Sequence, residues 1–565
     1  MDLKWVISEK TMSEETYALS KELNVPTIIS AILLRRGIDN LESAKRFFRP
    51  TIDRLYDPFL MQDMTVAVER LRRAVLSDEK ILIYGDYDVD GITSVSFLYL
   101  LLKEIGSDVS YYIPDRQLEG YGLSKAAVTE AQEKGIDLIV TVDCGVTGHN
   151  EIEEANSLGI DVIVSDHHEP GPTLPNAIAV LDPKRNDCPY PFKELAGVGV
   201  AYKLGQGLLT RMDIDLSILE KYIDMVAIGT SADIVPLVDE NRIFVKSGLE
   251  RLNDSESVGL KALMRTAGLD GREIGTGQIV FIIAPRINAV GRMGDAERAV
   301  KLLASEDERE ARNIAGILEE ENRHRKEVDE ETFHQALEMA EQQFIKDQTC
   351  SLVLHQRGWH SGVIGIVASR VVERFYRPTI LISIEDGVGK GSARSISGFD
   401  LYEALKGCED LLIAFGGHKY AAGLSIEEDK IEAFKKRFEE IARERLDEDL
   451  LIPKLSIDAE INLDDIDEAF MRLLKLFAPF GPQNMRPVFV SRNLQVVGSP
   501  SIVGRNHLKL KVRQHKRVFD VIGFNMGDLF YRIGPGEAHL DLAYVIEENE
   551  YMGRKTIQLR AKDLR

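Results

Sequence analysis

Short apolar runs alternate with helix-like segments between Lys80 and about Ala232. The runs ILIY (81–84), DLIVTVD (137–143) and DVIVSD (161–166) are rich in β-branched residues, and an aspartate ends or closely follows each of them. Strands of this kind separated by helices predict a parallel sheet covered by helices. Ligands of such sheets bind beyond the carboxyl ends of the strands. We therefore expect the three aspartate-bearing ends to meet in one crevice.

The rest of the chain divides by its pattern into further segments. The N-terminal stretch alternates helical patterns with short turns, and a charged, proline-free stretch after about residue 306 predicts one or two long connecting helices. A second α/β unit begins with SLVLHQ at Ser351. Period-two alternation in HLKLKVR and TIQLRAK predicts a β-rich tail. The domains that we predict are 1–75, 76–305, 306–346, 347–450 and 451–565.

The tail carries a concentration of positive charge. Between Met485 and Asp520 there are eight lysines and arginines and one acid. Small β-barrels of the oligonucleotide-binding (OB) type use basic strands of this kind to hold single-stranded nucleic acid. The alternative is an ordinary solvated sheet face. In HLKLKVR we expect Leu508, Leu510 and Val512 to face inward and Lys509, Lys511 and Arg513 to face outward; Phe489, Phe519 and Phe524 are interpreted as core residues.

Composition narrows the class of protein. The net charge of −22 disfavours a protein that simply coats duplex DNA, although it leaves room for a local basic groove. No apolar run reaches the roughly 18 residues of a membrane span, and the acidic N-terminus is unlike a secretory signal. Four cysteines without paired spacing suit a reducing cytoplasm and argue against a disulfide scaffold or a zinc ribbon. We expect a cytoplasmic location.

The stretch YGDYDVDG places Asp86, Asp88 and Asp90 within five residues, directly after the first predicted strand. Like charges this close repel one another unless a cation lies among them. The spacing suggests a calcium-binding EF-hand, but the twelfth position is Phe97 instead of glutamate, and the preceding segment is strand-like. Chance solvated acids are the remaining alternative. The apolar residues on both sides of the cluster argue against it.

Further carboxylates and two imidazoles follow other apolar stretches. Asp143 lies in VTVDCGVTG, Asp233 lies in SADIVPL, and VSDHHEP supplies Asp166, His167 and His168. Carboxylates with imidazole and without thiolate suit Mn²⁺ or Mg²⁺, whereas structural zinc usually recruits cysteine. Two such ions about 3.5–4 Å apart would activate a water and stabilise the oxygens of a phosphoryl displacement.

At this point the chain resembles a known family. DYDVDGITS, VTVDCGVTG, SDHHEP and SADIVPL, in this order, are similar to the four motifs of the DHH phosphoesterase superfamily, and GKGSARS and FGGHKYAAG resemble its associated substrate domain. PDRQLEGYGLS and APRINAVGRMGDA are features of one branch, the bacterial single-strand-specific 5′→3′ DNA exonucleases. The similarity runs from about residue 70 to 425. It implies an α/β fold: a parallel-sheet DHH domain and a smaller α/β DHH-associated domain joined by a long helix, with a C-terminal OB-like barrel.

The resemblance also assigns roles to the clustered residues. The metal ligands that it implies are Asp88, Asp90, Asp143, His167 and Asp233. His168 matches a histidine expected near the scissile phosphate and is counted with the catalytic group. Asp86 is an additional acid that could equally lie outside the ligands and contact them, and Asp166 is expected to orient an imidazole by a hydrogen bond. The chain departs from phosphoesterase relatives at Tyr84, where they commonly carry a histidine.

Several residues are candidates for handling the substrate. Arg116, Arg286 and Arg394 are expected to grip phosphate, because guanidinium pairs bidentately with its oxygens; the alternative for each is an ordinary salt bridge. A P-loop fails, since Ile384 stands where glycine is required and no hydroxyl residue follows Lys390. We expect the glycines there to let the backbone approach nucleic acid. The substrate-binding set is Arg116, Arg286, Ser392, Arg394, His418, Lys509, Lys511 and Arg513.

The motifs by themselves support phosphoester hydrolysis, and the resemblance adds the polarity and the preference for DNA. It implies an exonuclease that uses two Mn²⁺ or Mg²⁺ ions to release 5′-mononucleotides from single-stranded DNA, in repair and recombination. The implied partners are single-stranded DNA, a single-strand-binding protein and a helicase, with the chain acting as a monomer. One alternative is an oligoribonuclease or cyclic-dinucleotide phosphodiesterase, but those chains are shorter. The other is a non-catalytic nucleic-acid-binding relative, in which eroded ligands would be expected.

Overall fold

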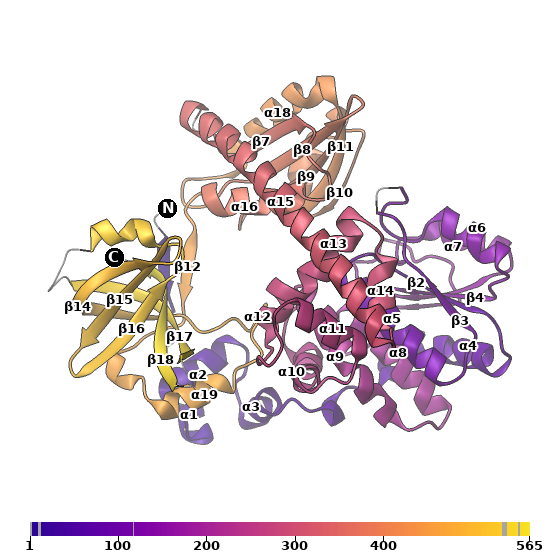
Figure 1. Ribbon diagram of the computed structural model, residues 1–565, viewed down its shortest axis with the longest axis horizontal. Helices are drawn as coiled ribbons and strands as arrows, with labels where there is room; N and C mark the ends of the chain where they lie inside the picture. The colour runs from indigo at the N-terminus through magenta and orange to yellow at the C-terminus, as the bar shows by residue number, and fades with distance from the viewer. Residues whose placement is uncertain (1–2, 9–12, 117, 348, 534–538, 552–553) are drawn as a thin grey trace. The chain divides into compact units, whose positions relative to one another are not determined.

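A computed structural model describes the chain except for residues 1–2, 9–12, 117, 348, 534–538 and 552–553 (Figure 1). It contains two compact units, which are described separately. One comprises residues 7–319 and 456–565, and the other comprises residues 1–6 and 320–455. Across the described residues, no helix is both long enough and apolar enough to cross a membrane.

The predicted parallel sheet is confirmed. Its strands are β2 (Ile81–Gly85), β3 (Val109–Tyr112), β4 (Leu138–Val142), β5 (Asp161–Ser165) and β6 (Ala179–Leu181), in the order β3-β2-β4-β5-β6. The last residues of β2, β4 and β5 are in register, with Gly85 opposite Val142 and Val142 opposite Ser165. The residues that follow these three strands therefore leave the same edge of the sheet at the same level.

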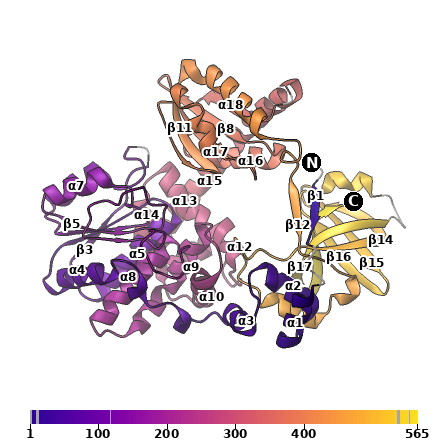
Figure 2. The same cartoon turned by 180° about the vertical axis from the view of Figure 1, so that it is seen from behind.

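Helices cover both faces of this sheet (Figures 1 and 2). α6 (Lys125–Glu133) and α7 (His149–Ser157) contribute to the core on one face, and α4 (Met64–Leu76), α5 (Val89–Glu104) and α8 (Gly197–Arg211) to the core on the other. α5 is buried along most of its length because its sequence is apolar on nearly every side. Further helices of this domain are α9 (Ile223–Ala232), α10 (Asp239–Asn253), α11 (Val258–Thr266), α12 (Thr276–Gln278), a π-helical turn (Ile279–Ile283), α13 (Ala284–Met293) and α14 (Glu297–Leu303).

The C-terminal strands form the expected closed barrel. They pair in the order β13-β14-β15-β16-β18-β17, and β14 also pairs with β17. Leu508, Leu510 and Val512 are buried and the residues between them are exposed, as their alternation predicts. The core interpretation holds for Phe489 and Phe519 but is wrong for Phe524, which is 51% exposed. The strands are β13 (Ala459–Glu460), β14 (Phe489–Val503), β15 (His507–Gln514), β16 (Arg517–Gly523), β17 (His539–Tyr551) and β18 (Arg554–Leu564), accompanied by α19 (Glu468–Lys475).

The N-terminal helices belong to the core of this barrel. Side chains of α1 (Glu14–Leu23), α2 (Thr27–Arg35) and α3 (Leu41–Phe48) share one hydrophobic cluster with α19 and the barrel strands. α4, by contrast, packs in the core of the parallel sheet. The sequence places all four in one N-terminal segment, because local patterns do not show which distant segment an apolar face covers.

The second unit is a smaller α/β domain with the strand order β10-β11-β9-β8-β7. α15 enters it as a single helix, Glu308–Asp347, where the sequence allowed one or two. The strands are β7 (Leu352–Arg357), β8 (Thr379–Glu385), β9 (Val388–Arg394), β10 (Ala414–His418) and β11 (Ala421–Glu427), and the helices are α16 (Ile364–Phe375), α17 (Leu401–Lys406) and α18 (Ile431–Arg445). Two short strands, β1 (Lys4–Ile7) and β12 (Lys454–Ile457), lie where the chain passes between the units.

Candidate metal centre and substrate-binding residues

The loop after β2 arranges three carboxylates around the first turn of α5. Asp88 caps this helix, because its Oδ1 accepts hydrogen bonds from the backbone N–H groups of Asp90 (2.9 Å) and Gly91 (3.2 Å). A Cβ at Gly91 would lie 2.4 Å from the carbonyl oxygen of Asp86, so only glycine permits this tight turn. The buried carboxylate of Asp90 accepts hydrogen bonds from two backbone N–H groups at the start of α8.

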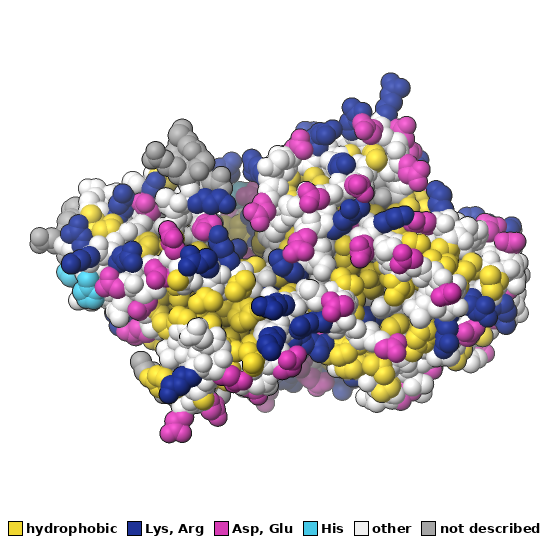
Figure 3. Space-filling view, turned by 90° about the horizontal axis from the view of Figure 1, so that it is seen from below, with side chains coloured by type: hydrophobic (Ala, Val, Ile, Leu, Met, Phe, Trp, Pro, Cys, Tyr) yellow, Lys and Arg dark blue, Asp and Glu magenta, His cyan; other side chains and the backbone are white. Residues whose placement is uncertain are grey.

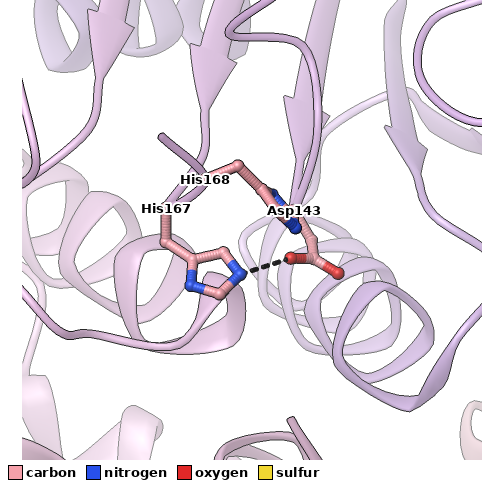
Figure 4. Close-up of side chains that lie close together, drawn as sticks. All are labelled: Asp143, His167 and His168. Atoms are coloured by element: carbon pink, nitrogen blue, oxygen red, sulfur yellow. Dashed lines mark ion pairs between the residues drawn. The ribbon is translucent and has the colours of Figure 1, made fainter. Parts of the chain in front are cut away.

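His167 lies at the centre of the remaining carboxylates. Its Nε2 is 3.1 Å from Oδ1 of Asp143, which follows β4, and Figure 4 shows the two side chains directed at one another. The same nitrogen is 3.6 Å from Oδ2 of Asp233 and 3.9 Å from Oδ2 of Asp90. Asp86, Asp88 and Asp143 form an adjoining group whose ligand atoms lie within 4.8 Å of one another. The strand ends predicted to converge do converge.

This cluster is electrostatically unfavourable by itself. Burial, and then the charge of Asp88, raise the pKa of Asp86 to about 8 and that of Asp90 to about 7. Burial followed by repulsion from Asp90 raises the pKa values of Asp143 and Asp233 well above their usual range. Buried oxygens of Asp86, Asp143 and Asp233 have no hydrogen-bond partner. Divalent cations would relieve both the repulsion and the missing partners.

The imidazole at the centre suits a cation as well. Burial, together with the charge of His168, lowers the pKa of His167 to about 3, so its ring is neutral and its Nε2 can offer a lone pair. An imidazole among carboxylates, without a thiolate, is the donor set that Mn²⁺ and Mg²⁺ accept. The residues present therefore fit the divalent metal that the sequence predicts.

Asp166 and His168 form a hydrogen-bonded pair beside this cluster. Oδ1 of Asp166 accepts from Nδ1 of His168 (2.8 Å) and from the backbone N–H of His167 (2.7 Å). Although burial alone would raise it, the hydrogen bond and charge of His168 hold the pKa of Asp166 at about 2. The same hydrogen bond outweighs burial and raises the pKa of His168, whose side chain is 44% exposed. Asp166 thus orients an imidazole as predicted, and that imidazole is the one of His168.

Two residues near this pair, Tyr121 and Asp182, are not among the site residues predicted from the sequence. The Tyr121 hydroxyl lies 3.1 Å from Nδ1 of His168. Asp182 follows β6, is fully buried, and has an oxygen without a hydrogen-bond partner; burial raises its pKa to about 7. AVLDP carries the same strand-then-aspartate signal as the other three ends. Its apolar run is shorter, so the pattern does not single it out.

Two of the predicted arginines, Arg116 and Arg286, differ in their surroundings. The Arg116 guanidinium lies 5.0 Å from the ring centre of Tyr87 in the carboxylate loop, and Arg116 lines a cavity of about 320 Å³ with Arg292. Arg286 is different, because it is buried, donates to Oε2 of Glu319 at 2.5 Å and also donates to the carbonyl of Ile282. The salt-bridge alternative therefore describes Arg286 in this structure, and a contact of Arg286 with phosphate stays a prediction.

Within the smaller unit, Ser392, Arg394 and His418 form a group of their own. Arg394 and His418 are level across the sheet, since both are opposite Ala421. Nη1 of Arg394 donates to Oγ of Ser392 at 3.2 Å. The nearby glycines have a packing role: a Cβ at Gly391 would lie 2.7 Å from the side chain of Leu424. That contact gives a packing reason for glycine at position 391, and the approach of a nucleic-acid strand to these glycines stays a prediction.

On the barrel, the three basic residues of β15 are exposed as predicted. Nζ of Lys511 lies 3.7 Å from Asp520, whereas neither Lys509 nor Arg513 has an ion-pair partner among the described residues. On the face shown in Figure 3, acidic and basic side chains of the described residues are interspersed.

Comparisons with known proteins agree with this architecture. Models of the DHH family N-terminal domain, the DHHA1 domain and the RecJ OB domain match residues 80–230, 347–444 and 457–563. The chain is 41% identical to the single-stranded-DNA-specific exonuclease RecJ of Bacillus subtilis (strain 168), over 99% of this chain and 70% of the relative. It is 36% identical to the RecJ of Escherichia coli (strain K12), over 97% of this chain and 96% of the relative.

A solved structure is similar throughout. The crystal structure of RecJ from Thermus thermophilus in complex with Mn²⁺ has a TM-score of 0.86 and 31% sequence identity, covering all of this chain and 79% of that one. The Mg²⁺ complex from the same organism has a TM-score of 0.80 and 29% identity, with 100% and 78% coverage. With full-length relatives above 30% identity and the matching domain order, this chain belongs to the RecJ family.

Proposed function

We propose that the chain is a divalent-metal-dependent exonuclease that removes 5′-mononucleotides from the 5′ end of single-stranded DNA. The observation that carries the proposal is the group of buried Asp90 and Asp143 and half-buried Asp233 around the neutral imidazole of His167. The relatives of this chain are named single-stranded-DNA-specific exonucleases, and the similar solved structures contain Mn²⁺ or Mg²⁺. The 5′→3′ direction and the role in repair and recombination rest on the motifs of this branch.

Asp88, Asp90, Asp143, His167 and Asp233 would hold the cations, with Asp86 beside them. Three overlapping groups of candidate ligands support a site for two ions rather than one. Cations bound there would lower the pKa of a water and stabilise charge on the phosphoryl oxygens.

The protein's own groups supply the remaining functions. The Asp166 carboxylate holds Nδ1 of His168, which leaves Nε2 of that half-exposed ring able to donate to a phosphate oxygen. Because the hydrogen bond raises the pKa of His168, its ring keeps the proton over more of the neutral range. Asp166 thus acts by position, and His168 by charge and proton donation.

Substrate binding would use the two other groups of predicted residues. We assign the 5′-terminal phosphate to Arg394, with Ser392 and His418, because a guanidinium beside a hydroxyl and an imidazole offers several donors to one anion. The outward lysines and arginine of β15 would follow the backbone of the strand. A single-strand-binding protein and a helicase as partners, a monomeric state and a cytoplasmic location belong to the same proposal and rest on the family resemblance.

The test is a time course with purified protein and Mn²⁺ on single strands labelled at either end. Release of labelled mononucleotide at once from the 5′ label, and late from the 3′ label, is expected. Early release from the 3′ label would reverse the direction, and absence of hydrolysis in Mn²⁺ and Mg²⁺ would refute the enzymatic proposal. A circular single strand of equal length is the control, since it has no end to attack.

A further inference from the structure

The residue after Asp233 has an unfavourable backbone conformation. α9 ends with Asp233 as its C-cap (φ −75°, ψ −3°), and Ile234 follows with φ +63°. This is the position where helices commonly place glycine in the left-handed conformation. A β-branched side chain is a poor choice there, because its Cβ crowds the backbone.

Other helices of the same chain show the usual solution. At the equivalent position five of them have glycine, with φ between +66° and +85°: Gly37, Gly106, Gly135, Gly159 and Gly268. After α8 the position is taken by Asp213 (φ +56°), a residue type that tolerates the conformation. Isoleucine beside the candidate metal centre is therefore a departure from the chain's own pattern.

Contacts on both sides hold Ile234 in place. The backbone N–H of Asp233 donates to the carbonyl of Gly229 at 3.0 Å, Val235 is buried in the core, and the N–H of Leu237 donates to the carbonyl of Pro482 at 2.9 Å. The Ile234 side chain itself is 71% exposed. Packing among the described residues therefore does not account for an isoleucine here, although strain of this kind persists where a function requires it.

We propose that Ile234 is a substrate-contacting residue that packs against a nucleobase flanking the scissile phosphate. Its neighbour Asp233 has Oδ2 only 3.6 Å from Nε2 of His167, so Ile234 is next in the chain to a candidate ligand of the centre where the phosphodiester would be cleaved, and it is exposed to a bound strand. An aliphatic group gains nothing from a phosphate, whereas a nucleobase presents an apolar face that it can cover. The inference rests on the proposed function, because it assumes a nucleic-acid strand in that place.

The experiment compares Ile234→Gly with wild type and with Asp213→Gly. Both substitutions place glycine at a left-handed helix end, but Asp213 is exposed at the end of a different helix and belongs to neither the metal centre nor the substrate-binding set. For Ile234→Gly we expect a KM on 5′-phosphorylated single strands that rises roughly tenfold with kcat little changed, because a uniform binding contact is lost. The unfolding midpoint should stay the same or rise, because glycine relieves the strain. Asp213→Gly should leave KM and kcat unchanged.

Two further measurements separate the proposal from its rivals. Replacing the first two nucleotides of the strand by abasic residues should abolish the difference between wild type and Ile234→Gly, and Ile234→Val should keep most of the wild-type affinity. A difference that persists on abasic strands would overturn the base contact. If excess Mn²⁺ restores the wild-type KM to Ile234→Gly, Ile234 acts through Asp233, and the proposal is wrong. If the unfolding midpoint of that variant falls below the wild-type value, Ile234 acts through packing, and the proposal is wrong as well. A wild-type protein without nuclease activity would refute the proposed function instead.

Discussion

The basic strand β15 allows a quantitative prediction. Changing Lys509, Lys511 and Arg513 to glutamine removes three exposed charges, while the alternating buried residues Leu508, Leu510 and Val512 keep the barrel core intact. Each phosphate contact on a single strand contributes about 0.7 to the slope of log affinity against log salt. Lys511 is partly neutralised by Asp520 at 3.7 Å, so we count between two and three contacts. The slope should become shallower by about 1.4–2.1.

The assay is fluorescence anisotropy on a long 5′-labelled strand across a fourfold range of salt, in calcium or without metal to prevent turnover. Over that range the wild type should lose about 7- to 20-fold more affinity than the variant. The control replaces three exposed lysines with glutamine elsewhere, at Lys261, Lys301 and Lys436, which changes the net charge equally. Equal salt slopes for wild type and the β15 variant, or equal effects of the two triple variants, would refute a strand-binding role for β15.

Three further predictions follow from the site residues. Arg394→Ala should weaken the preference for 5′-phosphate over 5′-hydroxyl strands by roughly ten- to a hundredfold in relative KM, with only partial rescue by lysine. Arg286→Met should lower the unfolding midpoint, by removing the partner of Glu319, yet leave that preference unchanged in the same kinetic comparison. The pKa values of buried Asp86 and Asp90 are raised to about 8 and 7, so above about pH 4 the folded metal-free protein binds more protons than the unfolded chain. Its free energy of unfolding, measured by urea titration, should therefore fall as the pH rises from about 4 to about 8. Added Mn²⁺ should reverse that loss at pH 8.

Local sequence pattern predicts the parts of the fold that depend on local chemistry. The strands before Asp86, Asp143 and Asp166 follow from β-branched apolar runs, and their convergence follows from the geometry of parallel sheets. The alternation in β15 likewise predicts which side chains face the barrel core. In each case neighbouring residues along the chain determine the outcome.

Features that depend on distant segments do not follow from such patterns. The sequence cannot show that α1, α2 and α3 pack on a barrel that begins more than four hundred residues later. Nor can it show that the guanidinium of Arg286 pairs with Glu319 or that Phe524 is exposed, because both depend on which residues from distant segments pack beside them. Ile234 is similar: its left-handed backbone is set by the end of α9 and the contact with Pro482.

The most direct test of the metal centre is Asp143→Asn. Asp143 has φ +60°, which asparagine tolerates, so the fold should survive while one anionic ligand beside His167 is lost. Mn²⁺ binding by calorimetry and single-turnover hydrolysis of a 5′-phosphorylated strand should be measured on the same protein preparations. We predict weaker Mn²⁺ binding and hydrolysis reduced by at least about a thousandfold, with unchanged strand affinity. Retention of more than about a tenth of wild-type hydrolysis at saturating Mn²⁺ would contradict the assignment of this cluster as the catalytic metal centre.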